Sequence, residues 1–311
     1  MKAMSAEECE ALLALSAERL GMTCWRCRGL SPPGSEHLVA EYALHDARTH
    51  EVRRRVIAKW YGDDAGERTF ALMQRLSGLL QEHRVRAPLA LPRALAYDPA
   101  LKLLLQERAA GARYAELMTR STWRHYLRRA GKALAQLHRL PPPAAPPRRM
   151  EHHVAELMRP HPLRLAEGVP HMEKRVLAVL AELVRLENAR PRAAAAAWLH
   201  RDFHLKQLLH GRGRVWVIDW DLAAHGDPAL DVGNFALNLR KHLRECAPAG
   251  RAAFLEGYFE AGDAEVASRI PLYEAFNCLR RACKAFRTRH ARWQRDLERR
   301  VAAAEEALSR M

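Results

Sequence analysis

The sequence of 311 residues has no apolar run that approaches the ~18 residues needed for a membrane-spanning helix. The run that comes nearest, AAAAAWL at 193–199, is far too short, so we expect no transmembrane segment. Glu7, Glu8 and Glu10 interrupt the N-terminal segment, where a signal peptide would be continuously apolar. We therefore expect an amphipathic helix there, on a cytoplasmic protein.

Closely spaced cysteines are also scarce. Among six cysteines, only Cys24 and Cys27, in CWRC, have the spacing of a metal or redox pair. No second pair follows, and zinc would need two more ligands. The favoured interpretation is two small apolar residues beside a strand, without a metal or redox role.

Acidic residues are outnumbered, with 36 Asp and Glu against 51 Lys and Arg, which gives a formal net charge of +15. A basic surface attracts anions such as nucleic acid, acidic lipid or phosphorylated metabolites, and an ordinary solvated arginine-rich surface explains the charge equally well. The sequence contains no nucleic-acid-binding motif and no basic stretch interleaved with aromatic residues, so we expect no nucleic-acid partner. Contact with an anionic membrane surface or a glycolipid stays open.

The hydrophobic patterns divide the chain into a strand-rich part and a helix-rich part. Residues 37–44, 52–61, 93–98 and 101–107 have strand patterns, and residues 66–80 have apolar residues at helical spacing. After Glu107 the patterns are helical over 124–140, over 171–188 and from about Leu230 onward. A short hairpin is predicted over 208–218. The sequence thus predicts an α+β protein whose parts meet near Gln106–Gly111.

Polar residues gather around that hairpin. HRDFHLKQLL at 200–209 presents Asp202 and, five residues later, Gln207, and the hairpin ends in Asp219. Because a hairpin returns the chain to its start, we predict that Asp202, Gln207 and Asp219 converge. Phosphoryl transfer needs an oxygen acceptor for the hydroxyl proton and oxygen ligands for magnesium, and these residue types supply both.

The chain resembles the aminoglycoside phosphotransferase and choline kinase-like family, which shares the protein-kinase fold. The resembling segments are HRDFHLKQLL for the catalytic loop, VIDWDLAAHGDPALDVGNF for the metal-binding segment, ALAQLH for a helix, LLLQERAAGARYAEL for the hinge and RVIAKWY for the third strand. The resemblance implies a bilobal protein-kinase-like fold. Residues 1–106 would form a small antiparallel-sheet N-lobe that covers the nucleotide. Residues 107–311 would form a larger, mainly helical C-lobe with the catalytic loop, the metal site and acceptor-binding helices.

The resemblance also implies roles for individual residues in an ATP- and Mg²⁺-dependent transfer of phosphate to a hydroxyl of a small molecule. Asp202 would be the catalytic base, Asp219 would bind Mg²⁺, and Lys59 would hold the α- and β-phosphates. The adenine would bind at Gln106, Glu107 and Ala109, and Asp231 would brace the catalytic loop. His138 and His200 are expected to be structural.

Two positions of the catalytic loop depart from the family pattern H-G-D-x-H-x-x-N. Gln207 stands where the family has Asn. Gln is one methylene longer but offers the same carbonyl oxygen, so we expect Gln207 still to bind the metal. Arg201 stands where small-molecule kinases usually have Gly, and we expect it to pair with a nearby carboxylate.

The N-terminal part departs as well. GLSPPGSEH takes the place of a glycine-rich loop, so backbone amides and Ser35 would cover the phosphates instead. The acidic partner of Lys59 is left open, because Glu67 is the candidate but Thr69 occupies the register expected for that acid.

The acceptor is predicted from charge. Arg280, Lys284 and Arg287 are spaced i, i+4 and i+7 on one helical face, in a region that lines the acceptor side in the resembling family. With Asp221, they are the predicted acceptor contacts. A polycationic antibiotic would need an acidic cleft, so among sugars, antibiotics, nucleosides and related metabolites we expect a neutral or anionic acceptor. The alternative is an ordinary basic surface paired with acids such as Glu298 and Glu305.

Two other functions remain alternatives. A protein kinase would explain HRD, but the sequence has no D-F-G or A-P-E motif and leaves almost no activation loop after Asp219. A catalytically weak pseudokinase or binding scaffold would explain Gln207 and the missing glycine-rich loop. The presence of Lys59, Asp202 and Asp219 argues against the scaffold.

Overall fold

The computed structural model describes residues 25–29, 38–46, 49, 51–85, 87–189 and 196–311. The chain forms two compact units. Unit 1 comprises Met1–Ala112 together with Leu208–Asp221, and unit 2 comprises Arg113–Gln207 together with Leu222–Met311. The predicted N-terminal helix, Cys9, Cys24, Ser35 and the turn at 30–36 lie outside the described residues. No helix in the described ranges is long and apolar enough to cross a membrane.

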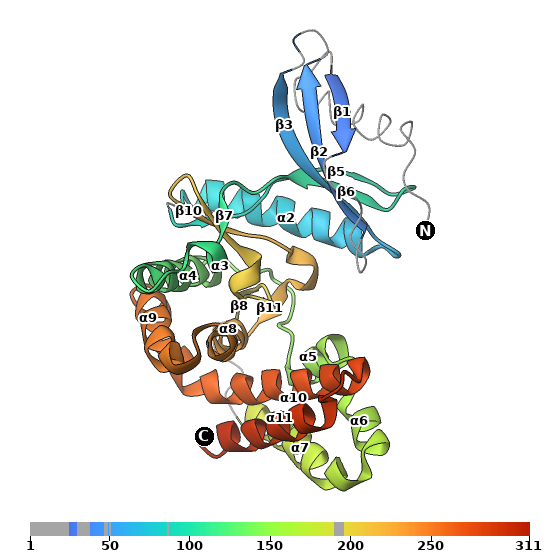
Figure 1. The fold of residues 1–311 in the computed structure, drawn as a ribbon, viewed down its shortest axis with the longest axis vertical. Helices are drawn as coiled ribbons and strands as arrows, with labels where there is room; N and C mark the ends of the chain where they lie inside the picture. The colour runs from blue at the N-terminus through green and yellow to red at the C-terminus, as the bar shows by residue number, and fades with distance from the viewer. Residues whose placement is uncertain (1–24, 30–37, 47–48, 50, 86, 190–195) are drawn as a thin grey trace. The chain divides into compact units, whose positions relative to one another are not determined.

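Unit 1 contains a five-stranded antiparallel sheet with the order β1-β2-β3-β6-β5 (Figure 1). Its strands are β1 (Trp25–Gly29), β2 (Leu38–Asp46), β3 (Val52–Trp60), β5 (Ala94–Asp98) and β6 (Leu103–Glu107). Helix α2 (Ala65–Glu82) packs against β5 and β6. The strands and the helix predicted over 37–107 are thereby confirmed, and β1 adds a strand that the sequence patterns did not indicate.

Alternation along the strands builds the core of unit 1. On β3, Val56 and Ala58 are buried and pack with Leu44 of β2 and with Leu103 and Leu105 of β6. These side chains lie two residues apart on their strands, so they project from one face of the sheet.

A second sheet of unit 1 has the order β4-β10-β9-β7. It joins β4 (Leu89–Ala90), β7 (Ala112–Arg113), β9 (Leu208–Gly211) and β10 (Arg214–Val217), and the β9–β10 pair is the predicted hairpin. Gly111 lets the chain after β6 run against this hairpin. It has φ +101°, and an added Cβ would lie 1.9 Å from the carbonyl oxygen of His210, so any other residue would collide with the backbone there.

Unit 2 is mainly helical, as the sequence predicted, with the two-stranded sheet β8 (Ala197–Leu199) and β11 (Ala224–Gly226). Its α-helices are α3 (Tyr114–Leu117), α4 (Trp123–His138), α5 (Met150–Leu157), α6 (Pro162–Gly168), α7 (Glu173–Asn188), α8 (Ala229–Leu243), α9 (Ala247–Phe259), α10 (Ile270–Thr288) and α11 (Trp293–Leu308). Short 3₁₀ segments occur at Pro170–Met172, Leu205–Gln207, Arg244–Cys246 and Ala264–Arg269, and one at Trp220–Leu222 links the units in sequence.

Two helix pairs dominate the packing of unit 2. Helices α4 and α9 approach closely because Gly131 and Gly257 have no side chains. A Cβ on Gly131 would lie 2.2 Å from the carbonyl oxygen of Phe254. Helices α10 and α11 lie side by side (Figure 1), and α10 also packs on α8. Helix α8 is therefore enclosed by its neighbours, and most of its residues are buried.

Candidate active site

The catalytic loop follows β8 and is fixed through its backbone by one carboxylate on α8. Asp231 is 0 % exposed. Its Oδ2 accepts a hydrogen bond from the N–H of His200 at 2.6 Å, and its Oδ1 accepts one from the N–H of Arg201 at 2.7 Å. Each bond satisfies a backbone donor that is buried away from water. The predicted bracing role of Asp231 is confirmed.

A second anchor lies just after Asp202. The ring of Phe203 is completely buried against Phe235 of α8, with ring centroids 5.3 Å apart, and Phe235 stacks on Phe254 of α9 at 4.2 Å. Asn234 Nδ2 donates to the carbonyl oxygen of Phe203 at 3.2 Å. The residues on both sides of Asp202 are thus held by α8, so its position follows from the helix packing of unit 2.

Arg201 explains why the resembling family usually has Gly at this position. Its φ is 64°, in the left-handed region that costs a residue other than Gly about 1 kcal/mol. The side chain is buried, and its Nη1 pairs with Glu156 Oε2 at 2.6 Å, which confirms the expected carboxylate partner. Arg280 Nη1 donates to the carbonyl oxygen of Arg201 at 3.0 Å. Contacts to the N–H, the carbonyl and the side chain together offset the backbone strain.

Asp202 lies among positively charged side chains. Arg280 Nη2 is 3.6 Å from its Oδ1, and His204 Nε2 is 3.4 Å from its Oδ2. Burial alone would raise the pKa of Asp202. The hydrogen bond from His204 and the charges of Arg280, His204 and His200 outweigh burial and lower the pKa to about 2. Asp202 is therefore ionised at neutral pH, and 28 % of its side chain remains exposed.

The two histidines expected to be structural have structural contacts. His200 Nδ1 accepts a hydrogen bond from the N–H of Asp202 at 3.3 Å, and His200 is completely buried. His138 is hydrogen-bonded through Nδ1 to the Tyr258 hydroxyl at 2.9 Å, and its Nε2 lies 3.4 Å from Asp231. Both histidines orient the groups that hold the loop.

In unit 1, Lys59 lies on the central strand β3 and is only 7 % exposed, which excludes the interpretation as a solvated edge-strand lysine. Its Nζ donates to Asp219 Oδ1 at 2.9 Å and to Asp221 Oδ2. Burial would lower the pKa of the ammonium group, but the charges of Asp221 and Asp219 and their hydrogen bonds raise it. Lys59 is held charged by two carboxylates from the chain after β10.

Tyr61 completes this cluster. Its hydroxyl donates to Asp221 Oδ1 at 2.8 Å, so Asp221, predicted as an acceptor contact, has both carboxylate oxygens engaged within unit 1. Burial raises the pKa of Tyr61, and the charge of Asp221 raises it further. Glu67, the candidate partner of Lys59, is exposed near the start of α2, whereas Thr69 is buried. Asp219 and Asp221 take the place expected for Glu67.

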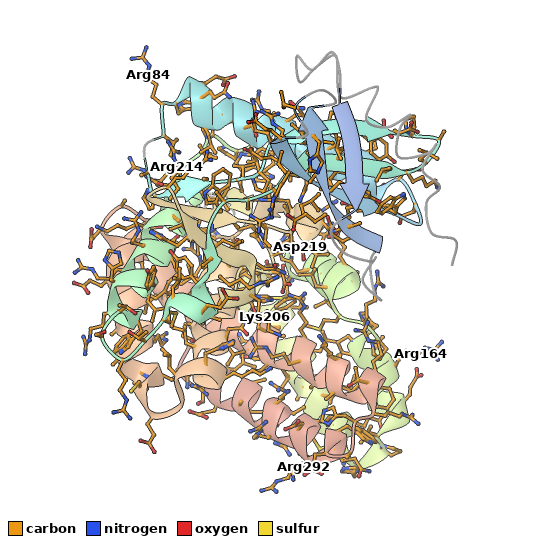
Figure 2. All side chains as sticks on the ribbon, turned by 45° about the horizontal axis from the view of Figure 1, so that its top comes forward. Arg84, Arg164, Lys206, Arg214, Asp219 and Arg292 are labelled. Carbon is orange, nitrogen blue, oxygen red and sulfur yellow. The ribbon has the colours of Figure 1, made fainter. Side chains whose placement is uncertain are left out.

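Asp219 follows β10 and has a φ of 68° (Figure 2). The hairpin register pairs Val217 with Leu208, so β10 returns the chain to the residue after Gln207. Gln207 ends its 3₁₀ turn in unit 2, and the convergence of Asp202, Gln207 and Asp219 stays a prediction. Within the described ranges, no three His, Cys, Asp or Glu side chains form a metal-binding group. Mg²⁺ does not need such a group, because one or two protein oxygens and the substrate phosphates are its usual ligands.

The predicted adenine contacts lie at the end of β6. Gln106 and Glu107 pair with Ile57 and Val56 of β3, and the Glu107 N–H donates to the carbonyl oxygen of Arg93 at 2.9 Å. Ala109 is buried just beyond the strand. Among the hydrogen bonds of the described residues, none uses its N–H. That donor suits a ring nitrogen of adenine.

The predicted acceptor contacts on α10 differ in their surroundings. Arg280 contacts Asp202 and the Arg201 carbonyl, whereas Lys284 and Arg287 are exposed. Glu298 pairs with His171, and Glu305 pairs with Arg175. The alternative interpretation, in which these two acids neutralise the basic stripe, is therefore wrong.

Sequence reasoning missed two residues of these clusters. Tyr61 lies two positions after Lys59, and the strand period of two would have placed both on one face. His204 follows Asp202 by two positions, and the family pattern H-G-D-x-H contains this histidine. The contact between Arg280 and Asp202 had no signal in the sequence, because it depends on how α10 packs on α8.

The sequence profile of the phosphotransferase enzyme family (APH) matches residues 30–272. The chain therefore belongs to this family and is a phosphotransferase that acts on hydroxyl groups. Comparison with curated proteins found no match.

Solved structures show the same fold at low sequence identity. A choline/ethanolamine kinase family protein from Mesorhizobium loti is 18 % identical, with a TM-score of 0.63 over 99 % of this chain and 97 % of that chain. An amicoumacin kinase in complex with AMP-PNP, Ca²⁺ and amicoumacin is 15 % identical, with a TM-score of 0.65 over 96 % and 93 %. Aminoglycoside phosphotransferase APH(4)-Ia, in a ternary complex with ADP and hygromycin B, is 17 % identical, with a TM-score of 0.61 over 96 % and 97 %. The predicted kinase-like α+β fold is confirmed.

We expect Asp231→Ala to lower the free energy of unfolding of the chain by about 3 kcal/mol, because two buried N–H groups lose their acceptor. Denaturant unfolding followed by tryptophan fluorescence measures the change. Asp263→Ala, which removes an exposed acid of unit 2 that accepts only one local N–H, is the control. Equal stability of the two variants would contradict the bracing role.

We expect Arg280→Gln to raise the pKa of Asp202 from about 2 towards the ordinary aspartate value of about 3.9. Because the pKa is depressed, the stabilisation from Asp202 is present above about pH 3.9 and is lost as the pH falls through about 2. Loss of Arg280 narrows this pH window. NMR titration of ¹³C-carboxyl aspartate, assigned with Asp202→Asn, measures the pKa. Arg292→Gln, at an exposed arginine, should leave it unchanged.

Proposed function

We propose that the chain transfers the γ-phosphate of ATP, with Mg²⁺, to a hydroxyl group of a small molecule. The observation that carries the proposal is the fixed, ionised and partly exposed carboxylate of Asp202 in a chain of the phosphotransferase family. A carboxylate in this state accepts a hydrogen bond from an acceptor hydroxyl and orients its oxygen for attack.

Asp202 acts mainly by orientation. With a pKa of about 2, Asp202 is a weak base at neutral pH, so the proton leaves the hydroxyl late, as the new bond forms. The acceptor oxygen bonds to the γ-phosphorus, and the bond between that phosphorus and the β–γ bridging oxygen breaks. ADP departs with the electron pair of that bond, and the hydroxyl proton passes through Asp202 to solvent.

Unit 1 supplies the groups that hold the nucleotide. Lys59 would bind the α- and β-phosphates, and the N–H of Ala109 would bind adenine, as the resemblance implies. Asp219 and the amide oxygen of Gln207 are hard oxygen ligands that suit Mg²⁺, which when bound neutralises charge on the phosphates. The complexes of related folds with AMP-PNP, Ca²⁺ and ADP support nucleotide and metal use.

The acceptor is proposed to be a neutral or anionic small molecule such as a sugar, a nucleoside or a related metabolite. The cations around Asp202 disfavour a polycationic acceptor, because Arg280, Arg201 and His204 would repel ammonium groups. A cytoplasmic location and contact with an anionic membrane surface or a glycolipid stay predictions.

The first test is nucleotide binding by thermal shift. We expect ATP to raise the unfolding midpoint of the wild type only when Mg²⁺ is present, and we expect Asp219→Ala to abolish the Mg²⁺-dependent part. Asp64→Ala, at an exposed acid of unit 1, should behave as the wild type. No shift with any nucleoside triphosphate would favour the binding scaffold over the kinase.

The contacts of Asp221 predict a role in holding Lys59 for the nucleotide. We expect Asp221→Asn to raise the KM for ATP about tenfold and Tyr61→Phe to raise it about threefold, with smaller changes in kcat, because each loses a hydrogen bond to a charged group. Steady-state ADP release measures both constants, and Asp64→Asn is the matched control. If Asp221→Asn instead raised the KM for the acceptor alone, the original assignment of Asp221 to acceptor binding would stand.

A further inference from the structure

Helices α10 and α11 carry more arginine charge near Asp202 than their own acids neutralise. Every acid of the two helices has a basic partner within 4 Å: Glu274 with Arg251 and Arg310, Asp296 with Arg299 and His290, Glu298 with His171, Glu305 with Arg175, and Glu306 with Arg310. Arg281 and Arg300 are partly buried, and neither takes part in an ion pair or a side-chain hydrogen bond within the part of the chain that the structure describes.

These two arginines continue the positive charge that begins at Asp202. Arg280 contacts Asp202 directly, Arg281 follows Arg280 on α10, and Arg300 acts on Arg281 from α11. The charge of Asp202 reaches both Arg280 and Arg281. Asp296 acts on Arg300 from one turn away, but its contacts go to Arg299 and His290.

Clustering of these cations carries an energetic cost. Burial and the neighbouring charge of Arg300 lower the pKa of Arg281 to about 10, and burial lowers the pKa of Arg300. Partly buried guanidinium groups need acceptors, and the planar fork of arginine matches the paired oxygens of phosphate and carboxylate. A bound oxyanion would provide the acceptors that the chain itself does not.

We propose that Arg281 and Arg300 bind an anionic group, a phosphate or a carboxylate, of the acceptor whose hydroxyl is oriented by Asp202. The inference rests on the proposed function for the hydroxyl and extends it by naming the acceptor class. Arg280 holds Asp202 at the boundary between the two subsites. The chain then selects acceptors that carry both a hydroxyl and an oxyanion.

The first experiment measures binding of inorganic phosphate by calorimetry at constant ionic strength. It uses full-length Lys59→Met as the background, so that phosphate held by Lys59 does not contribute. We expect Arg281→Gln and Arg300→Gln to weaken phosphate binding at least about tenfold each, Arg281→Lys to retain part of it, and Arg292→Gln to leave it unchanged. Arg292 is exposed just before α11 and points away from the helices (Figure 2).

A second readout checks that the variants fold and that the repulsion is real. Without phosphate, Arg300→Gln should unfold at a higher temperature than the wild type, because a partly buried like charge beside Arg281 is gone. Superimposable phosphate titrations for Arg281→Gln, Arg300→Gln and Arg292→Gln would overturn the proposal.

The activity assay compares acceptors in pairs that differ only by the anionic group. ADP release would be measured with glucose, glucose 6-phosphate and glucuronate, and with nucleosides and their monophosphates. We expect the charged member of a pair to have the higher kcat/KM, and Arg281→Gln to remove that preference. Preference for the phosphorylated or for the carboxylate member identifies the oxyanion.

The two proposals fail separately. Turnover of acceptors without preference for the charged member would overturn the oxyanion site and leave the kinase function standing. Arginine-dependent phosphate binding without turnover of any acceptor would support the oxyanion site and count against the kinase function.

Discussion

The carboxylate of Asp231 is the contact on which the candidate active site depends. It receives two consecutive backbone N–H groups in the interior of unit 2, and this fixes the turn at which Arg201 adopts a left-handed conformation. The left-handed residue in turn presents Asp202 to partial exposure while Phe203 is buried. One buried acid on a packed helix thereby determines the direction of the neighbouring reactive acid.

The charges of the two units are satisfied in different ways. In unit 1, the single buried ammonium group of Lys59 lies against two carboxylates and a tyrosine hydroxyl bonded to one of them. In unit 2, Arg201 has Glu156, but Arg281 and Arg300 have no such partner among the described residues. A buried cation without a carboxylate is costly in a folded protein, so surplus guanidinium groups beside a reactive acid indicate a ligand that brings the missing charge.

Local patterns in the sequence predicted the strands of the first sheet, the hairpin and the main helices, because alternation and helical spacing are properties of adjacent residues. The bracing role of Asp231 and the carboxylate partner of Arg201 were also predicted, from the resemblance and from the charge of a residue in a glycine position. The partners of Lys59 were not predicted. Asp219 and Asp221 lie some 160 residues away from it, and their contact depends on the path of the whole chain. The cluster of Arg281 and Arg300 depends likewise on the packing of α10 against α11.

Unit 1 is not a continuous piece of sequence, and this determines when it can be completed during synthesis. Its second sheet needs β9 and β10, and β4 pairs with β10, so the unit stays unfinished until the ribosome has released residues 208–221. Until then Lys59 has neither of its carboxylates, and burial of its ammonium group would be unfavourable. Helices α3 to α7 emerge during this interval, and domains generally fold as units as they emerge. The N-terminal unit of this chain therefore closes only after much of its C-terminal neighbour has been synthesised.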